Sequence, residues 1–97
     1  MAALQKTIQA KQDLIGIWHY TVGTWGEARA DAYLLKLESC FEKISRGSAR
    51  LRPLAGNIKF IRCEHHYVFV LAEKKPLVIA VFHEKMDYIT RIKKRIS

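Results

Sequence analysis

Two uninterrupted apolar runs near the end of the chain constrain its fold most strongly. Residues 67–72 read YVFVLA and residues 77–82 read LVIAVF, and both are rich in β-branched and aromatic side chains. Successive side chains of a strand point to opposite faces, so a run without polar alternation predicts a strand that is buried on both sides. The polar residues EKKP between the two runs predict an antiparallel hairpin. Other parts of the chain must therefore cover this hairpin.

Weaker strand signals lie before the hairpin and at the start of the chain. Residues 58–63, IKFIRC, alternate in part, as expected for a strand with one exposed face. The His65–His66 corner predicts a tight turn into the hairpin, which makes a three-stranded meander. Residues 4–8 predict a short edge strand. Residues 47–56 contain Pro53 and Gly56 and are interpreted as a loop.

Apolar side chains recur at helical spacing in two segments that precede the strands. The first segment is expected to break at residues 21–24, where Gly23 suits the left-handed residue after a helix. The second is expected to run from Gly26 to Ile44 and to end at Arg46 and Gly47. The apolar positions of the first helix are Ala10, Leu14, Ile17 and Trp18, and those of the second are Ala30, Leu34, Leu37, Phe41 and Ile44.

A third helical pattern closes the chain, with Ile89, Ile92 and Ile96 at spacings of three and four among basic residues. The order β-α-α-β-β-β followed by a short C-terminal helix predicts an α+β fold. In this fold the N-terminal αα-hairpin packs on one face of a small antiparallel sheet. Ninety-seven residues support a single core, so residues 1–97 are expected to form one domain.

The charge of the chain is concentrated in its second half. Residues 1–46 hold 6 Lys and Arg against 5 Asp and Glu, whereas residues 47–97 hold 11 against 4, a net charge of +7. This imbalance favours an acidic partner, although scattered cations are more often a solvated surface. No segment resembles a secretory leader or spans a bilayer, so a cytoplasmic protein without membrane contact is expected. Cys40 and Cys63 are accordingly expected to be reduced thiols, with a disulfide as the alternative.

The sequence resembles the RelE/ParE superfamily of bacterial toxins, and its ParE branch most closely. Residues 13–21 (DLIGIWHYT) and 25–28 (WGEA) resemble the two helices of that branch, and residues 66–69 (HYVF) and 81–87 (VFHEKMD) resemble its later strands. The motifs occur in the family's order over nearly the whole chain. Further matching positions are Ala30, Tyr33, Leu37, Phe41, Arg62 and the segment 53–56.

The resemblance implies a toxin of a type II toxin–antitoxin pair that inhibits DNA gyrase by trapping its cleaved DNA complex. It implies no catalysed reaction and no cofactor. A cognate acidic, ParD-like antitoxin would neutralise it, and contact with DNA would arise indirectly through the toxin–antitoxin complex. Family antitoxins wrap the helix hairpin, so the aromatic residues there are candidates for antitoxin binding: Trp18, Tyr20, Trp25 and Tyr33.

The RelE branch instead cleaves ribosome-bound mRNA, which requires a base, an acid and cations for the phosphate. Here Lys59 matches one expected cation, but Ile61 stands at its alternate neighbour and residues 67–70 carry no cation. This departure argues against a ribonuclease, although Arg62, His65, His66 and His83 form an improvised set. A non-toxic basic module that binds nucleic acid is the third hypothesis.

The candidate target-binding residues are the cations and histidines of the second half of the chain. For the C-terminal helix a solvated face is an equally plausible interpretation. His83 is more simply a residue that caps the sheet or pairs with Asp87, and the spacing of Cys63, His65, His66 and His83 matches no standard zinc site, so no metal is predicted. The candidates for gyrase or DNA contact are Lys59, Arg62, His65, His83, Lys85, Arg91, Lys93, Lys94 and Arg95.

Overall fold

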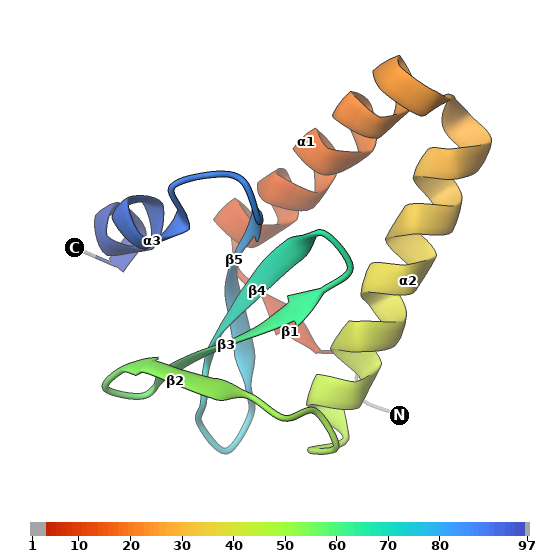
Figure 1. Ribbon diagram of the computed structural model, residues 1–97. Coiled ribbons are helices and arrows are strands. Elements are labelled where there is room, and N and C mark those ends of the chain that lie inside the picture. Colours follow the sequence, from red (N-terminus) through yellow and green to blue (C-terminus); the bar gives the residue numbers. More distant parts are fainter. Residues whose placement is uncertain (1–3, 97) are drawn as a thin grey trace.

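The computed structural model describes residues 4–96, which form five strands and three helices (Figure 1). The predicted α+β order is present, with one additional strand. The elements in chain order are β1 (Gln5–Lys6), α1 (Ile8–Trp25), α2 (Glu27–Ser45), β2 (Arg52–Ala55), β3 (Ile58–Cys63), β4 (His66–Leu71), β5 (Leu77–His83) and α3 (Tyr88–Ile96).

The strands form one mixed sheet in the order β1-β5-β4-β3-β2. The two apolar runs are its neighbouring strands β4 and β5, which pair antiparallel with Tyr67 opposite Phe82. The short edge strand β1 pairs with β5 in parallel. At the other end, β3 and β4 are joined through the turn residues Glu64 and His65, with Cys63 opposite His66.

Strand β2 lies inside the segment that was interpreted as a loop, so that interpretation is wrong for Arg52–Ala55. The strand pairs only with β3, and its register shifts between Pro53 and Ala55. A proline cannot donate a backbone hydrogen bond and is therefore tolerated at a sheet edge or a bulge. Because three of its four residues are exposed, the sequence has no apolar alternation there that would predict a strand.

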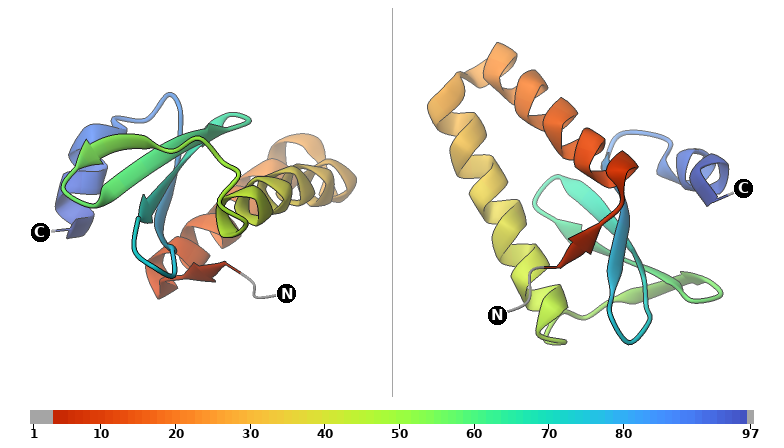
Figure 2. Two further views of the ribbon diagram at one scale, coloured as in Figure 1. Left: turned by 90° about the horizontal axis from the view of Figure 1, so that it is seen from below. Right: turned by 180° about the vertical axis from the view of Figure 1, so that it is seen from behind.

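Each face of the sheet has its own apolar cluster. Figure 2 shows the helix hairpin on one side of the sheet and α3 on the other. The helix hairpin covers one face, where Leu37 and Phe41 of α2 pack with Val68 and Val81 of the sheet. On the other face Ile92 of α3 packs with a second cluster that is centred on Phe69 and Phe82. The two covers explain why β4 and β5 show no polar alternation. The expected packing of the hairpin on one sheet face is confirmed.

The break between the two long helices lies at Gly26, and the prediction that placed it around Gly23 is wrong. Helix α1 continues through Gly23 to Trp25. The hydroxyls of Thr21 and Thr24 donate to the helix carbonyls of Ile17 and Tyr20 four residues earlier. Gly26 has φ 91° and ψ 166°. This backbone region is essentially restricted to glycine, which fixes the position of the turn.

The two glycines should therefore respond in opposite directions to substitution by alanine. Gly26→Ala is expected to lower the free energy of unfolding by about 1–3 kcal/mol, because alanine is strained at this φ. Gly23→Ala, the matched control, should raise it by up to about 1 kcal/mol, because Gly23 is helical and nothing lies within 4 Å of an added Cβ. Urea denaturation of both variants measures this, and equal stabilities would contradict the assignment.

A disulfide joins Cys40 in the second half of α2 to Cys63 at the end of β3, with the two Cα atoms 6.1 Å apart. The expectation of two reduced thiols is therefore wrong. The residues are 23 positions apart in sequence. They meet because the buried stripe of α2 lies along the sheet, a proximity that the periodicity of either segment alone does not reveal.

Among the helices of residues 4–96, none is long and apolar enough to cross a membrane.

Candidate partner-binding groove

A groove of about 1020 Å³ lies between the helix hairpin and the segment that leads from β5 into α3. Ile17 of α1 and Val81 and Phe82 of β5 contribute to its apolar lining. Aromatic side chains of the hairpin line one wall, and histidines and cations of the sheet end line the other. These side chains are Tyr20, Trp25 and Tyr33 on the hairpin, and His65, His66, His83, Lys85 and Arg91 across from it.

Three of the four aromatic residues proposed for antitoxin binding thus lie in one place. Tyr20 and Trp25 are 70% and 60% exposed, although both are large and partly apolar. The guanidinium of Arg29 lies 5.1 Å from the ring centre of Trp25, which gives this wall a cation as well. Trp18 does not line the groove. Its indole Nε1 donates a hydrogen bond of 3.0 Å to Asp31 on α2, so it links the two helices.

A hydrogen-bonded network at the mouth of the groove fastens α2 to the β3–β4 turn. The Tyr33 hydroxyl lies 2.5 Å from Nδ1 of His66 and accepts a hydrogen bond of 3.1 Å from the backbone N–H of His65. Burial raises the pKa of Tyr33. Burial, reinforced by the neighbouring His83 and His65, lowers the pKa of His66 to about 4. At neutral pH the imidazole of His66 is therefore uncharged.

A second network ties two candidate target-binding residues to one carboxylate. Arg62 Nη2 and His65 Nδ1 each lie 2.9 Å from an oxygen of Glu84. The hydrogen bond from His65 and the nearby charge of Arg62 lower the pKa of Glu84. One carboxylate therefore engages both side chains at the β3–β4 turn. The predicted tight corner is present, with Glu64 at φ 58°, and it turns His65 outward and His66 into the core as alternate strand-end positions require.

His83 does not pair with Asp87, so that half of the expectation is wrong, and the ring instead caps the backbone at the end of β5. Its Nδ1 accepts a hydrogen bond of 3.1 Å from the backbone N–H of Lys85, and its ring lies 5.0 Å from that of His66. The carboxylate of Asp87 accepts instead from the backbone and hydroxyl of Thr90 at the start of α3. Asp87 therefore caps the N-terminus of α3, because its carboxylate accepts from an N–H that has no partner within the helix.

The remaining candidate cations are divided between the groove and other surfaces. Lys85 and Arg91 line the groove, whereas Lys59, Lys93 and Lys94 lie outside it. Arg95 reaches the groove but is engaged by Asp13 and by the backbone carbonyl of Ile79. The C-terminal helix therefore does not act as one uniform basic face.

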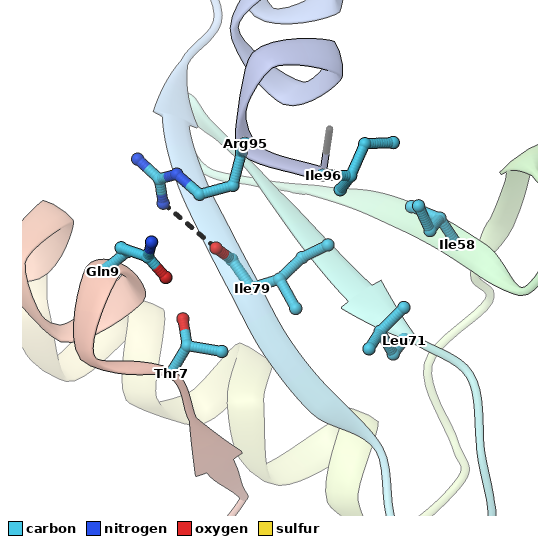
Figure 3. A pocket seen from close by; sticks show the side chains of 7 residues that line it. All are labelled: Thr7, Gln9, Ile58, Leu71, Ile79, Arg95 and Ile96. Carbon is cyan, nitrogen blue, oxygen red and sulfur yellow. Dashed lines mark hydrogen bonds between the residues drawn. The ribbon is translucent and has the colours of Figure 1, made fainter.

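Figure 3 shows Arg95 beside Ile79 of β5, where it borders a smaller cleft of about 450 Å³. Most of this cleft is apolar, with Ile58, Leu71, Ile79 and Ile96 around it, and the guanidinium is the one charged group among the labelled side chains. Within residues 4–96, no three His, Cys, Asp or Glu side chains are placed to hold a metal ion.

Sequence reasoning missed two features of the groove. Lys36 and Arg29 of α2 line it as well, although neither was among the predicted site residues. The second feature is that three members of the improvised set, His65, His66 and His83, line the same groove. Neither feature could be predicted from the sequence, because both depend on how the helix hairpin packs against the end of β5. Spacing along α2 places Arg29, Tyr33 and Lys36 on one helix face but does not identify what faces them.

Comparisons with known proteins agree with this architecture. The family described as "ParE toxin of type II toxin-antitoxin system, parDE" matches residues 4–88. A protein of Escherichia coli named "Toxin ParE" is 38% identical over 102 residues, an alignment that covers 100% of this chain and 99% of that protein. A solved structure titled "Chromosomal ParDE TA system from P. aeruginosa" superposes with a TM-score of 0.73 at 16% identity, covering 86% of this chain and 96% of that one.

Proposed function

Because the chain belongs to the ParE toxin family of type II toxin–antitoxin systems, we propose that it inhibits DNA gyrase and that an acidic antitoxin neutralises it. Inhibition would proceed by trapping the cleaved gyrase–DNA complex, without a reaction catalysed by the toxin. The observation that carries the proposal is the groove, because it places exposed aromatic anchors and unshielded cations in a single partner-sized surface.

The aromatic wall suits an amphipathic antitoxin segment. Tryptophan and tyrosine are the residues that most often dominate binding energy at protein interfaces, and Tyr20, Trp25 and Tyr33 lie along one wall. A helix docked in such a groove would place apolar side chains against them. Its acidic residues would face Arg29 and Lys36, and the net charge of +8 would speed its approach.

The cationic side of the same groove suits the target. Lys85 and Arg91 are exposed and lie across from the aromatic wall, so a segment that occupies the groove would cover them. Neutralisation would then follow from simple occlusion. The exposed Lys93 lies outside the groove and would stay available to nucleic acid, which supports an indirect DNA contact by the complex. The proposal places the protein in the cytoplasm, where gyrase meets its DNA.

One assay tests both halves of the proposal. Purified chain should inhibit gyrase supercoiling and accumulate cleaved DNA, and the antitoxin encoded beside it should restore activity. The double variant Tyr20→Ala/Trp25→Ala should still inhibit gyrase but should need about 100-fold more antitoxin for rescue, because two anchors are lost. Leu35→Ala is the matched control, since Leu35 is 68% exposed but lies outside the groove.

Two results would contradict the proposal. Supercoiling that is unaffected at micromolar chain would exclude gyrase as the target. Equal rescue of the double variant and the control would place the antitoxin elsewhere.

A second candidate function, cleavage of translated mRNA, is favoured by one observation. The imidazole of His65 is held by Glu84 and lines the same groove as the cations Lys85 and Arg91, and such a set of side chains can move a proton near a phosphate. Primer extension on translated mRNA during expression separates the two. Cleavage products that disappear in His65→Gln would support this candidate, and intact mRNA together with DNA damage would support gyrase.

A further inference from the structure

The Cys40–Cys63 bond lies where α2 meets the end of β3. Cys40 belongs to the stripe of α2 that faces the sheet, between the buried residues Leu37 and Phe41. Its Cα lies 6.1 Å from that of Cys63, within the range that a disulfide spans without backbone movement. Cys63 is buried, whereas Cys40 is only half-buried. A small thiol or disulfide can therefore reach Cys40 first.

This bond acts on the same two elements as the Tyr33 network. Tyr33 precedes Cys40 by seven residues, which is two turns or roughly 10 Å along the helix. The partners of Tyr33 are His65 and His66, which follow Cys63 directly across the turn. A covalent tie and a hydrogen-bonded tie thus hold one helix to one strand end, and the hydrogen-bonded tie borders the groove.

The fold does not depend on the covalent tie alone. Leu37, Phe41 and Ile44 of α2 remain packed against the sheet through apolar contacts whether the sulfurs are joined or not. Reduction removes the constraint on the distance between α2 and β3, and two thiols need more room than the bond between them. The hydrogen-bonded contact of Tyr33 should therefore open more often in the reduced chain, while the overall fold persists.

We propose that Cys40 and Cys63 form a reversible redox latch, which holds the Tyr33 wall of the groove in place when oxidised and loosens it when reduced. The oxidant is a disulfide of a small thiol. The Cys40 thiolate attacks it and releases one small thiol, and the Cys63 thiolate then attacks the Cys40 sulfur of the mixed disulfide and releases the second. Two protons and two electrons leave the protein, and the small disulfide becomes two thiols.

The backbone N–H of His65 is the natural reporter, because it donates to the Tyr33 hydroxyl at the mouth of the groove. Full-length chain is equilibrated in buffers of reduced and oxidised glutathione, and free thiols are counted by alkylation and mass spectrometry. Amide hydrogen exchange at His65 should be about tenfold slower in the oxidised chain than in the reduced chain. The variant Cys40→Ala/Cys63→Ala should exchange like the reduced chain and ignore the redox buffer.

Two outcomes overturn the latch. One is the persistence of two alkylatable thiols in oxidising buffer, and the other is equal exchange at His65 in both states. The comparison needs no mutation, because the wild-type chain in reducing buffer serves if the double variant does not fold. The amide of Ala30, buried in the first part of α2 and distant in sequence from both cysteines, should exchange equally in both states and is the internal control.

A consequence for partner binding rests on the proposed function. If the groove is the antitoxin site, the reduced chain should bind the antitoxin about tenfold more weakly, because the wall must be ordered on binding. Unchanged affinity beside a clear exchange difference would count against the groove as the docking site and leave the latch intact. An absent exchange difference would overturn the latch whatever the antitoxin does.

Discussion

Replacing Asp13 with alanine is expected to lower the free energy of unfolding by about 3–5 kcal/mol. The carboxylate of Asp13 pairs with Arg95 of α3, with 2.9 and 3.2 Å between the paired atoms. It also accepts a hydrogen bond of 3.0 Å from the backbone N–H of Val81 on β5. Both charged side chains are mostly buried, at 16% and 20% exposed. The substitution therefore leaves a buried guanidinium and a strand N–H without this acceptor.

The position of this pair makes the effect large. Strand β1 is only two residues long, so beyond Val78 the edge of β5 has no strand beside it. Arg95 donates to the carbonyl of Ile79 (Figure 3). Asp13 accepts from the backbone N–H of Val81, so two side chains take the place of a neighbouring strand. The same contacts hold the last turn of α3 against the sheet. Loss of Asp13 should therefore release α3 as well as weaken the edge.

Urea denaturation with a probe of α3 measures the result. The exposed pair Glu42–Arg46 on α2 is the matched control, and Glu42→Ala should cost no more than about 0.5 kcal/mol. Asp13→Asn retains an acceptor for Val81 and should fall between the two. A loss below 1 kcal/mol for Asp13→Ala would mean that the pair contributes little to the fold.

Acidification from pH 6.5 to pH 4 is expected to remove up to about 3 kcal/mol of stability through His66. The folded chain holds the pKa of His66 at about 4, below the ordinary value of 6.5, because the ring is buried beside His83 and His65. The unfolded chain thus binds the proton at a higher pH than the folded chain. The contribution is complete above pH 6.5 and is lost as the pH falls towards 4.

The groups that face His66 define the control. Tyr33 faces it from α2, His83 from β5, and His65 and Glu84 lie at the adjoining turn ends. Urea denaturation at pH 7, 6, 5 and 4 should show the loss in wild type and a flatter profile in His66→Gln, whatever the absolute stability of that variant. His19→Gln on the exposed part of α1 should retain the wild-type profile. Parallel profiles for all three proteins would assign the acid sensitivity to other groups.

The helices and the central strands could be predicted from the sequence, because local patterns determine them. The stripe from Ala30 to Ile44 specifies one buried helix face, and the apolar runs in β4 and β5 specify strands covered on both sides. The helix boundary was misplaced because Gly23 and Gly26 look alike in sequence, and only the backbone angle at Gly26 separates them. Strand β2 was missed because an exposed edge strand needs no apolar pattern.

The residues of the site could also be predicted only in part from the sequence. Tyr20, Trp25 and Tyr33 were identifiable as exposed aromatic residues of a helix hairpin, and the basic second half was visible in the charge distribution. The sequence did not show which of these cations pair with carboxylates. Arg62 and Arg95 are held by Glu84 and Asp13, which lie 22 and 82 residues away in sequence.

The amino-acid sequence by itself determined the elements of this protein and their apolar faces, because hydrophobic burial acts on periodic patterns of neighbouring residues. The tertiary structure alone decided which side chains meet. It joined Cys40 to Cys63, set Tyr33 against His66, and opened a groove between an aromatic wall and a cationic one. These contacts depend on how the hairpin crosses the sheet, and side-chain packing between distant segments sets that crossing.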